Sequence, residues 1–390
     1  MKVYALVDCD SFFVSCEQKM NPALKDKPVC VLSNKDGCVI ARSYEAKQMG
    51  VRMGQPYFMA KKEFPNAIYV SCHHDLYGEI SEQVMSFLRE FSPKVQVYSV
   101  DEAFVDLTGL KKLYKKNYYE LAQYIREQIR DRIDIPVSIG VSSTKTLAKL
   151  ASDKSKKDRS GVYLIGKGKI PKVLKETKVE EIWGIGRNLT VLCKRSGILS
   201  AADLVAKEDV WLDKNFGIHG LEMKHELLGE ICSPVTNEEK PPKSIQKTSA
   251  FGIFTSDLDF IKNQLNYHIH SACRKLRKID CKAKVIGVML RTKDFRVFYD
   301  KIQIANPTAF ELEISDIAFM LLNNIYDKNI LYRSTGIILE NFSPNKEEQL
   351  YLFADETIDG KKERLSKCFD NLEKKFGKNI IQIGFREDRT

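Results

Sequence analysis

The stretch from Val95 to Gly109, VQVYSVDEAFVDLTG, most constrains the fold, because apolar and polar residues alternate on both sides of an adjacent acidic pair. Successive side chains of a strand point to opposite faces, so Asp101 and Glu102 cannot both reach one point from a regular strand. They can converge only where the backbone turns, as in a hairpin. Two converging carboxylates repel each other unless a divalent cation lies between them. Taken alone, the stretch favours the simpler interpretation, a strand pair with an exposed acidic turn.

A second acidic strand end lies near the N-terminus. Residues 3–7 form a short apolar run that predicts a buried strand, and it ends in Asp8-Cys9-Asp10. The end of a buried strand is a common position for a metal-binding carboxylate. For Asp10 we expect a different role, capping the helix predicted from Ser11 to Met20. From the pattern alone, the two aromatic residues at 12 and 13 are core residues.

The order of predicted elements gives a reason for these acidic residues to meet. Amphipathic patterns predict helices at 77–91 and 121–133, and a further strand at 137–141. An insert with predicted strands at 27–32, 38–42 and 67–70 and a short helix at 43–49 interrupts them. Without the insert, the order is βαββαβ, a split ferredoxin-like sheet with helices on one face. That sheet would place Asp8 beside the Asp101–Glu102 turn.

The second half of the chain predicts a helical region and a second βαββαβ module. Residues 166–232 predict short helices with glycine turns at 182–186 and 216–220. Such turns can offer backbone N–H groups to a phosphate, although plain helix packing also explains them. Residues 233–243 contain three prolines and predict a linker. The strands of the second module are predicted at 247–254, 284–291, 296–304 and 332–342.

Charge and cysteine content narrow the class of protein. Lys and Arg outnumber Asp and Glu by 62 to 52, and residues 145–178 hold eleven basic side chains against three acidic ones. This local excess favours a polyanionic partner. The ten cysteines include no CxxC pair, so a structural zinc site is not expected. No apolar run reaches membrane-spanning length, and free thiols without an export signal predict a cytoplasmic protein without a membrane partner.

Six motifs in order resemble the Y-family (UmuC/DinB-type) translesion DNA polymerases, over nearly the whole chain. VDCDSFFVSCE at 7–17 and YSVDEAFVDLTG at 98–109 are similar to the family's two metal motifs, and ARSYEAKQMGVRMG at 41–54 to its finger motif. IGVSSTKTLAKLASDKSK at 139–156 resembles its palm segment, IWGIGRNL at 182–189 its thumb hairpin, and QLYLF at 349–353 its sliding-clamp peptide. From residues alone, that pentapeptide is either a last strand or a peptide ligand. The tail that follows, KKERLSKCFDNLEKKFGK, is more similar to UmuC proteins than to the DinB branch.

The resemblance implies a multidomain α+β right-hand polymerase. The catalytic palm would comprise residues 1–10 and 76–165, and the small fingers insert residues 11–75. A helical thumb with helix-hairpin-helix turns would span 166–232, followed by the linker at 233–243. The little finger would be the second βαββαβ module, at 244–345, and the tail with the clamp peptide would span 346–390.

The resemblance also assigns site residues. Asp8, Asp101 and Glu102 correspond to the catalytic carboxylates, which with the backbone carbonyl of Cys9 would hold two Mg²⁺ ions, for which Mn²⁺ can substitute. The nucleotide-binding residues it implies are Phe12, Phe13 as the steric gate against the ribose 2′-OH, Arg42, Tyr44, Lys47 and either Lys156 or Lys157. Many relatives have arginine where this chain has Lys47, which keeps the charge but loses the bidentate contact. DNA contacts are expected from Gly184, Gly186, Lys243, Lys247 and Arg291, and clamp contacts from Gln349, Leu350, Leu352 and Phe353.

The function implied is a DNA-directed DNA polymerase of the translesion type, acting in the SOS response and DNA repair. It would add deoxynucleotides to a primer 3′-OH opposite damaged or undamaged template. Its expected partners are primer–template DNA, a dNTP, the sliding clamp and, by analogy to UmuC, a UmuD-like subunit. The alternatives left open are a two-metal nuclease or nucleotidyl cyclase on a similar palm, and a DNA-binding scaffold without activity.

Overall fold

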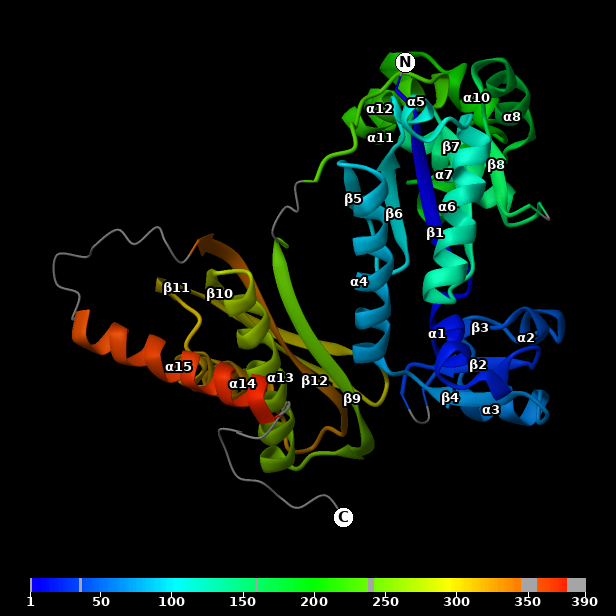
Figure 1. Ribbon diagram of the computed structural model, residues 1–390. Helices are drawn as coiled ribbons and strands as arrows, with labels where there is room; N and C mark the ends of the chain where they lie inside the picture. Colours follow the sequence, from blue (N-terminus) through cyan, green and yellow to red (C-terminus); the bar gives the residue numbers. More distant parts are fainter. Residues whose placement is uncertain (1, 35–36, 159, 238–241, 345–355, 377–390) are drawn as a thin grey trace. The chain divides into compact units, whose positions relative to one another are not determined.

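The structure is a computed structural model that describes residues 2–34, 37–158, 160–237, 242–344 and 356–376. The chain divides into two compact units, residues 1–239 and 240–390, and each is described by itself (Figure 1). The α+β class expected from the sequence is confirmed by the order of helices and strands. None of the described helices combines the length and the apolar character needed to cross a membrane.

The first unit is built on a five-stranded sheet in the order β5-β6-β1-β7-β8. Its central strand β1 (Tyr4–Cys9) is antiparallel to both β6 (Glu102–Asp106) and β7 (Val137–Ser142). Strand β5 (Val95–Val97) pairs with β6, and the order of these four strands is that of a split ferredoxin-like sheet. The fifth strand β8 (Val162–Leu164) runs parallel to β7 and was not predicted, because three residues carry too little pattern.

Both faces of this sheet are covered by helices, which corrects the prediction of helices on one face. Helices α4 (His74–Phe91) and α6 (Tyr118–Ile133) share one buried core with Ala5 and Val7 of β1. The alternate residues Tyr4 and Leu6 face the opposite side, where Ala148 of α7 (Lys145–Ser155) packs against them. Helix α7 approaches closely because Gly140 of β7 has no side chain, and a Cβ there would lie 2.0 Å from the backbone nitrogen of Ser152.

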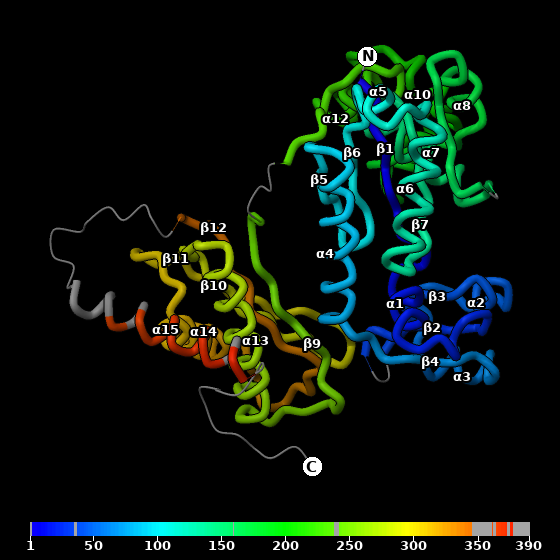
Figure 2. The backbone as a smooth tube through the Cα atoms, viewed as in Figure 1, coloured from blue at the N-terminus to red at the C-terminus, as the bar shows by residue number. Residues whose placement is uncertain are grey.

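The insert between β1 and α4 forms a small sheet of its own in the order β3-β2-β4. Figure 2 shows α1 leading from the end of β1 toward this sheet. The insert core is formed by Cys30, Leu32, Val39 and neighbouring apolar residues, separate from the core around β1. Its elements are α1 (Phe12–Met20), β2 (Val29–Leu32), β3 (Val39–Arg42), α2 (Tyr44–Gln48), α3 (Tyr57–Glu63) and β4 (Ile68–Ser71).

Residues 166–232 are helical, as predicted, and pack against α7. Buried Glu226 holds this contact, because its carboxylate accepts hydrogen bonds from the backbone of Thr146 at 3.1 Å and of Cys232 at 3.0 Å. The helices are α8 (Ile170–Glu176), α9 (Arg187–Arg195), α10 (Ala201–Val205), α11 (Asp209–Phe216) and α12 (Ile218–Leu228). A short helix α5 (Leu110–Tyr114) precedes α6.

The start of the predicted linker belongs to the first unit. Val235 is 2% exposed and packs with Tyr4 and Leu6 against the sheet. The side chain of Asn237 accepts a hydrogen bond from the backbone of Val95 at 2.8 Å and donates one to Pro93 at 2.6 Å. The boundary between the two units falls after Glu239, inside the predicted segment 233–243.

The second unit has the predicted βαββαβ order but a different sheet from the first. Its strands lie in the order β11-β10-β12-β9, all antiparallel, so the first strand is at the edge and not in the centre. Helices α13 and α14 pack on one face through Ile261, Leu265, Ile314 and Leu322. The elements are β9 (Ser244–Thr255), α13 (Leu258–Lys278), β10 (Cys281–Thr292), β11 (Val297–Thr308), α14 (Glu311–Ile325), β12 (Tyr332–Pro344) and α15 (Glu356–Phe376).

Candidate active site

Asp8 and Glu102 face each other across two neighbouring strands. They are directly paired in the antiparallel register of β1 and β6, and they lie on the sheet face that α7 covers. Their carboxylates hydrogen-bond to each other. Asp8 is 5% exposed, so the pair is held in a largely desolvated position at the ends of these strands.

Asp101 lies in the turn before β6, and its carboxylate is bonded to a neighbouring serine. Its backbone carbonyl accepts a hydrogen bond from Cys9 at 2.9 Å, while its carboxylate accepts one from the Ser99 hydroxyl. The expectation that three carboxylates meet is therefore fulfilled for Asp8 and Glu102 but not for Asp101. Within the described part of the chain, no three His, Cys, Asp or Glu residues are grouped so that they could hold a metal ion. A third negative charge beside the pair would be repelled, whereas Ser99 offers a donor.

Two lysines from α7 and its C-terminal end supply positive charge to the pair. Lys156 Nζ donates to Asp8 Oδ2 at 2.7 Å, and Lys149 Nζ contacts Glu102 Oε1. Of the two lysines left open by the sequence, Lys156 is the one that reaches the carboxylates. Lys149 was not predicted. The available signal was its spacing of seven residues from Lys156, because two helical turns place both side chains on one face.

The pKa values of the pair move in opposite directions. Burial, followed by the hydrogen bond with Glu102, raises the pKa of Asp8 to about 7 despite the nearby Lys156. Burial alone would raise the pKa of Glu102, but hydrogen bonds from Asp8 and Lys149 lower it. Contact between two buried carboxylates disfavours the ionisation of both, and the raised pKa falls on Asp8. The two carboxylates supply hard oxygen ligands of the kind that a divalent cation such as Mg²⁺ takes.

Asp10 does not cap α1, so that prediction was wrong. Its carboxylate accepts a hydrogen bond from Ser138 of β7 at 2.7 Å, and its backbone carbonyl accepts one from Ser15 at 2.6 Å. The residue at the cap position is Ser11, which has a left-handed backbone with φ 46° and makes no side-chain cap bond. Its hydroxyl accepts a hydrogen bond from Lys47 Nζ at 2.8 Å. Asp10 was misassigned because its partner lies 128 residues away, beyond any local signal.

The predicted nucleotide-binding residues differ in exposure. Phe12 is 3% exposed and belongs to the core, whereas Phe13 is only partly buried. Arg42 donates to the backbone carbonyl of Val51, and within the described residues its Nε is buried without a hydrogen-bond partner. Tyr44 is 68% exposed. Burial and then the nearby Arg42 lower the pKa of Lys47.

The glycine turn before α9 packs beside the acidic hairpin. Gly184 has φ 95°, a left-handed conformation that favours glycine, and Gly186 is the N-cap residue of α9. Trp183 precedes Gly184 and reaches the hairpin, because its Nε1 donates to the Tyr98 hydroxyl at 3.1 Å and its ring contacts Phe104. Both aromatic partners come from the hairpin that carries Asp101 and Glu102.

In the second unit, the predicted DNA contacts lie on different faces of the sheet. The buried side chains of Val288 and Leu290 pack against the helices, so Arg291, next in β10, faces away from them. Within the described residues, the buried Nε of Arg291 has no hydrogen-bond partner. Lys247 lies two residues from buried Ile245 and lowers the pKa of His268 of α13, so it lies on the helix-covered side. Lys243 is exposed just before β9. The predicted clamp residues 349–353 lie outside the described residues.

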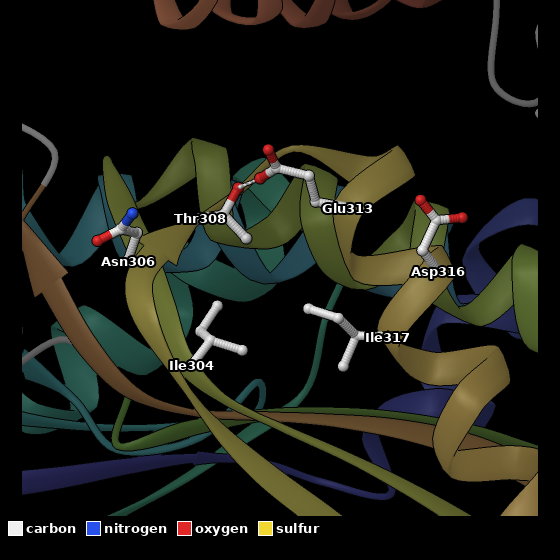
Figure 3. Close-up of a pocket in the computed structure, with 6 residues that line it drawn as sticks. All are labelled: Ile304, Asn306, Thr308, Glu313, Asp316 and Ile317. Carbon is white, nitrogen blue, oxygen red and sulfur yellow. Dashed lines mark hydrogen bonds between the residues drawn. The ribbon is translucent and has the colours of Figure 1, made fainter. Parts of the chain in front are cut away.

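A hollow of about 380 Å³ lies between β11 and α14, where Glu313 accepts a hydrogen bond from Thr308 at 2.7 Å (Figure 3). Ile304 and Ile317 form its apolar floor and Asp316 stands at its rim. None of the predicted site residues lines it.

The sequence matches two family profiles. Residues 7–153 match the impB/mucB/samB family, and residues 242–352 match the C-terminal domain of the same family. Protein UmuC of Salmonella typhimurium is 32% identical over 392 residues, covering 97% of this chain and 92% of that protein. The chain belongs to the impB/mucB/samB family. DNA polymerase IV of Dehalococcoides mccartyi is 30% identical over 381 residues, covering 97% of this chain and 96% of that protein.

Solved structures of Y-family polymerases share the fold. A Y-family DNA polymerase chimera of Dbh and Dpo4 superimposes with a TM-score of 0.74 at 28% identity, over 88% of this chain and 100% of that one. An insertion ternary complex of Dbh DNA polymerase superimposes with a TM-score of 0.61 at 27% identity, with the same coverage. The resemblance to the Y-family is thus confirmed. The placement nearer to UmuC than to DinB stays a prediction, since the identities of 32% and 30% differ little.

Proposed function

We propose that this chain extends a DNA primer past template lesions, with the chemistry at Asp8, Asp101 and Glu102. Its family, together with relatives named UmuC and DNA polymerase IV, makes it a DNA-directed DNA polymerase of the translesion class that acts in DNA damage tolerance. The observation that carries the placement is the buried Asp8–Glu102 pair, which is directly paired across β1 and β6 and flanked by two lysines. Such a perturbed pair in a polymerase fold is a candidate for the reacting centre.

The family relationship implies dependence on a divalent metal. We propose two Mg²⁺ ions, with Mn²⁺ able to replace them, held by Asp8, Glu102, Asp101 and the backbone carbonyl of Cys9. When bound, two such ions stabilise the attacking primer oxygen and the departing pyrophosphate. Asp101 would join by exchanging its hydrogen bond with Ser99 for the metal. Lys149 and Lys156 neutralise the pair in the metal-free protein.

The incoming dNTP would be bound from two sides. Lys156, rather than Lys157, would contact the triphosphate, because its ammonium group already lies beside Asp8. Arg42, Tyr44 and Lys47 would contact it from the insert, where Tyr44 is 68% exposed. Phe13 would be the steric gate. Phe12 is too deeply buried for that contact, and we assign it to the wall behind the gate.

The domain assignment follows the same proposal. Palm (1–10 and 76–165), fingers (11–75) and thumb (166–232) would form the first unit, and the little finger (244–345) the second. The turn at Gly184 and Gly186 would contact the DNA backbone, as would Arg291 on the sheet face that points away from α13 and α14. Lys243 precedes that sheet, and Lys247 would contribute long-range attraction from the covered side.

Primer–template DNA and dNTP are partners that follow from the polymerase class, and the ternary complex of Dbh DNA polymerase is similar to this chain. Two further partners, a sliding clamp and a UmuD-like subunit, belong to the proposal. A sliding clamp would bind the segment with Gln349, Leu350, Leu352 and Phe353, and a UmuD-like subunit would accompany it. Replacing Gln349, Leu352 and Phe353 with alanine should abolish clamp binding in a pull-down, and retained binding would show that the segment is not the clamp ligand.

Primer extension with dNTPs and Mg²⁺ tests the central proposal. Asp101→Ala and Glu102→Ala should each lower the rate by at least about 10²-fold, while the exposed control Glu127→Ala should leave it unchanged. No extension by the wild-type protein, even with clamp and accessory proteins supplied, would refute it. Nothing observed favours the alternatives of a two-metal nuclease, a nucleotidyl cyclase or an inactive scaffold.

A further inference from the structure

The ring of Phe13 rests on a second aromatic ring that is itself fixed. Phe13 lies in the first turn of α1 and stacks on Tyr77 of α4, with ring centroids 4.6 Å apart and an interplanar angle of 18°. Tyr77 is 2% exposed and therefore has little room to move. His74 meets both rings edge-on, at 6.4 Å from Phe13 and 6.2 Å from Tyr77. The position of the Phe13 ring thus depends on Tyr77.

Tyr77 is held by a buried carboxylate from the helix that carries Phe13. Glu17 follows Phe13 by one helical turn and is 6% exposed. Its Oε1 accepts a hydrogen bond from the Tyr77 hydroxyl at 2.5 Å and another from His73 Nδ1 at 2.7 Å. Burial and then Glu17 raise the pKa of Tyr77, so its hydroxyl keeps the proton that it donates. Hydrogen bonds to an ionised acceptor are short and strong, and they restrict the ring that donates them.

The burial of the Glu17 carboxylate between α1 and α4 needs an explanation. Burying one is unfavourable unless donors compensate it, and an apolar side chain would tie α1 to α4 without that cost. What the carboxylate adds is direction, because it fixes the rotation and the height of the Tyr77 ring under Phe13. A gate that discriminates by contact with one hydroxyl group depends on such fixed placement.

We propose that Glu17 is a positioning residue for sugar discrimination, acting through Tyr77 on Phe13. This inference rests on the proposed function, in which Phe13 is the steric gate. Glu17 does not touch the substrate in this proposal. Its hydrogen bond keeps the Tyr77 ring in place, and the Phe13 ring then stands where a ribose 2′-OH would clash. A loosened Tyr77 lets Phe13 tilt away, so ribonucleotides gain access while deoxynucleotides are still used.

The test compares kcat/KM for a dNTP and the matching rNTP in primer extension by the full-length protein with Mg²⁺. Glu17→Gln and Tyr77→Phe, which keep the shapes of the side chains, should each lower the ratio of the two values by about tenfold, the size of effect that a small steric contact provides. The dNTP kcat should change little. Glu79→Gln, an exposed position on the same helix as Tyr77, is the matched control and should leave the ratio unchanged.

A double-mutant cycle separates positioning from general loosening. If Glu17 acts through the gate, Glu17→Gln should add almost nothing once Phe13→Ala has removed the ring, because the effects of coupled residues do not add. Full additivity in the cycle would overturn the inference. So would wild-type ratios in both Glu17→Gln and Tyr77→Phe while Phe13→Ala lowers the ratio. Should Glu17→Gln fail to fold, Tyr77→Phe alone decides, since it keeps the packing.

Failure of the underlying assignment gives a different result. If Phe13→Ala leaves the sugar preference of an active enzyme unchanged, the gate itself is wrong and the proposed function must be revised. If the wild-type protein extends primers and Phe13→Ala lowers the ratio, the gate stands, and only the Glu17 variants bear on the present inference.

Discussion

Replacing Asp8 with asparagine should make the metal-free protein more stable while abolishing polymerase activity. Asp8 is 5% exposed, and burial followed by its bond with Glu102 raises its pKa from 3.8 to about 7, even with Lys156 beside it. The folded protein therefore binds the Asp8 proton more tightly than the unfolded chain does. This contribution to stability is complete below pH 3.8 and is lost as the pH rises through about 7.

The size of the effect follows from these values. One pKa unit corresponds to about 1.36 kcal/mol, so ionising Asp8 alone would cost the folded state about 4 kcal/mol at pH 8. Glu102 offsets part of this, because its pKa is lowered by the same contact. We expect Asp8→Asn to raise the free energy of unfolding by about 1–3 kcal/mol at pH 8, or the melting temperature by about 3–8 °C.

Differential scanning calorimetry in EDTA, at pH 8 and pH 5, would measure the gain. It should shrink at pH 5, where wild-type Asp8 is protonated and as neutral as asparagine. Asp101→Asn is the control. Its carboxylate is partly exposed and bonded to Ser99, so this variant should lose activity without becoming more stable. A lower melting temperature of Asp8→Asn at pH 8, or an equal gain at both pH values, would refute the reasoning.

Three further predictions concern other parts of the molecule. Lys156→Met should raise the KM for dNTP by about tenfold, a loss of about 1.4 kcal/mol of binding, whereas Lys157→Met should not; equal effects would contradict the assignment of the triphosphate contact to Lys156. Trp183→Phe keeps an aromatic ring but loses the hydrogen bond to Tyr98, so it should lower stability by about 1 kcal/mol and weaken primer–template binding in fluorescence anisotropy. Unchanged affinity would argue against a thumb role. Asp370→Ala should speed proteolysis of α15, since it removes both bonds to Arg277, at 2.7 and 2.8 Å; an unchanged digestion rate would show that other contacts hold this helix.

The strands of the first unit could be predicted from the sequence because their apolar residues are the ones that the folded sheet buries. Ala5 and Val7 alternate with Tyr4 and Leu6, and both sets are buried, on opposite faces. The same alternation places Asp8 on the α7 face. What the pattern could not supply was the approach of α7 to that face, which depends on Gly140. The contact of Lys149 with Glu102 follows from that approach and was therefore missed.

The sheet of the second unit shows a different limit. Its four strands and two helices were predicted in the right order, yet that order is compatible with either sheet. In the first unit the first strand lies between β6 and β7, and in the second it pairs with β12 at the edge. Strand order is decided by side-chain packing between distant segments, such as Ile245 with Ile261 and Leu339, and a single sequence does not display those pairings.

The edge position of β9 has a mechanical consequence. The connection between the two units leads directly into this strand, which spans 12 residues and contributes Ile245 to the buried core of its unit. Tension along the connection would load the β9–β12 hydrogen bonds from one end, so these bonds would break one after another. Helices α13 and α14 would meanwhile stay packed against β10, β11 and β12. Detachment would release roughly 40 Å of chain, at about 3.3 Å per residue. The second unit could then yield to a pull by lengthening its tether and refold that strand afterwards, losing only the part of its core that β9 supplies.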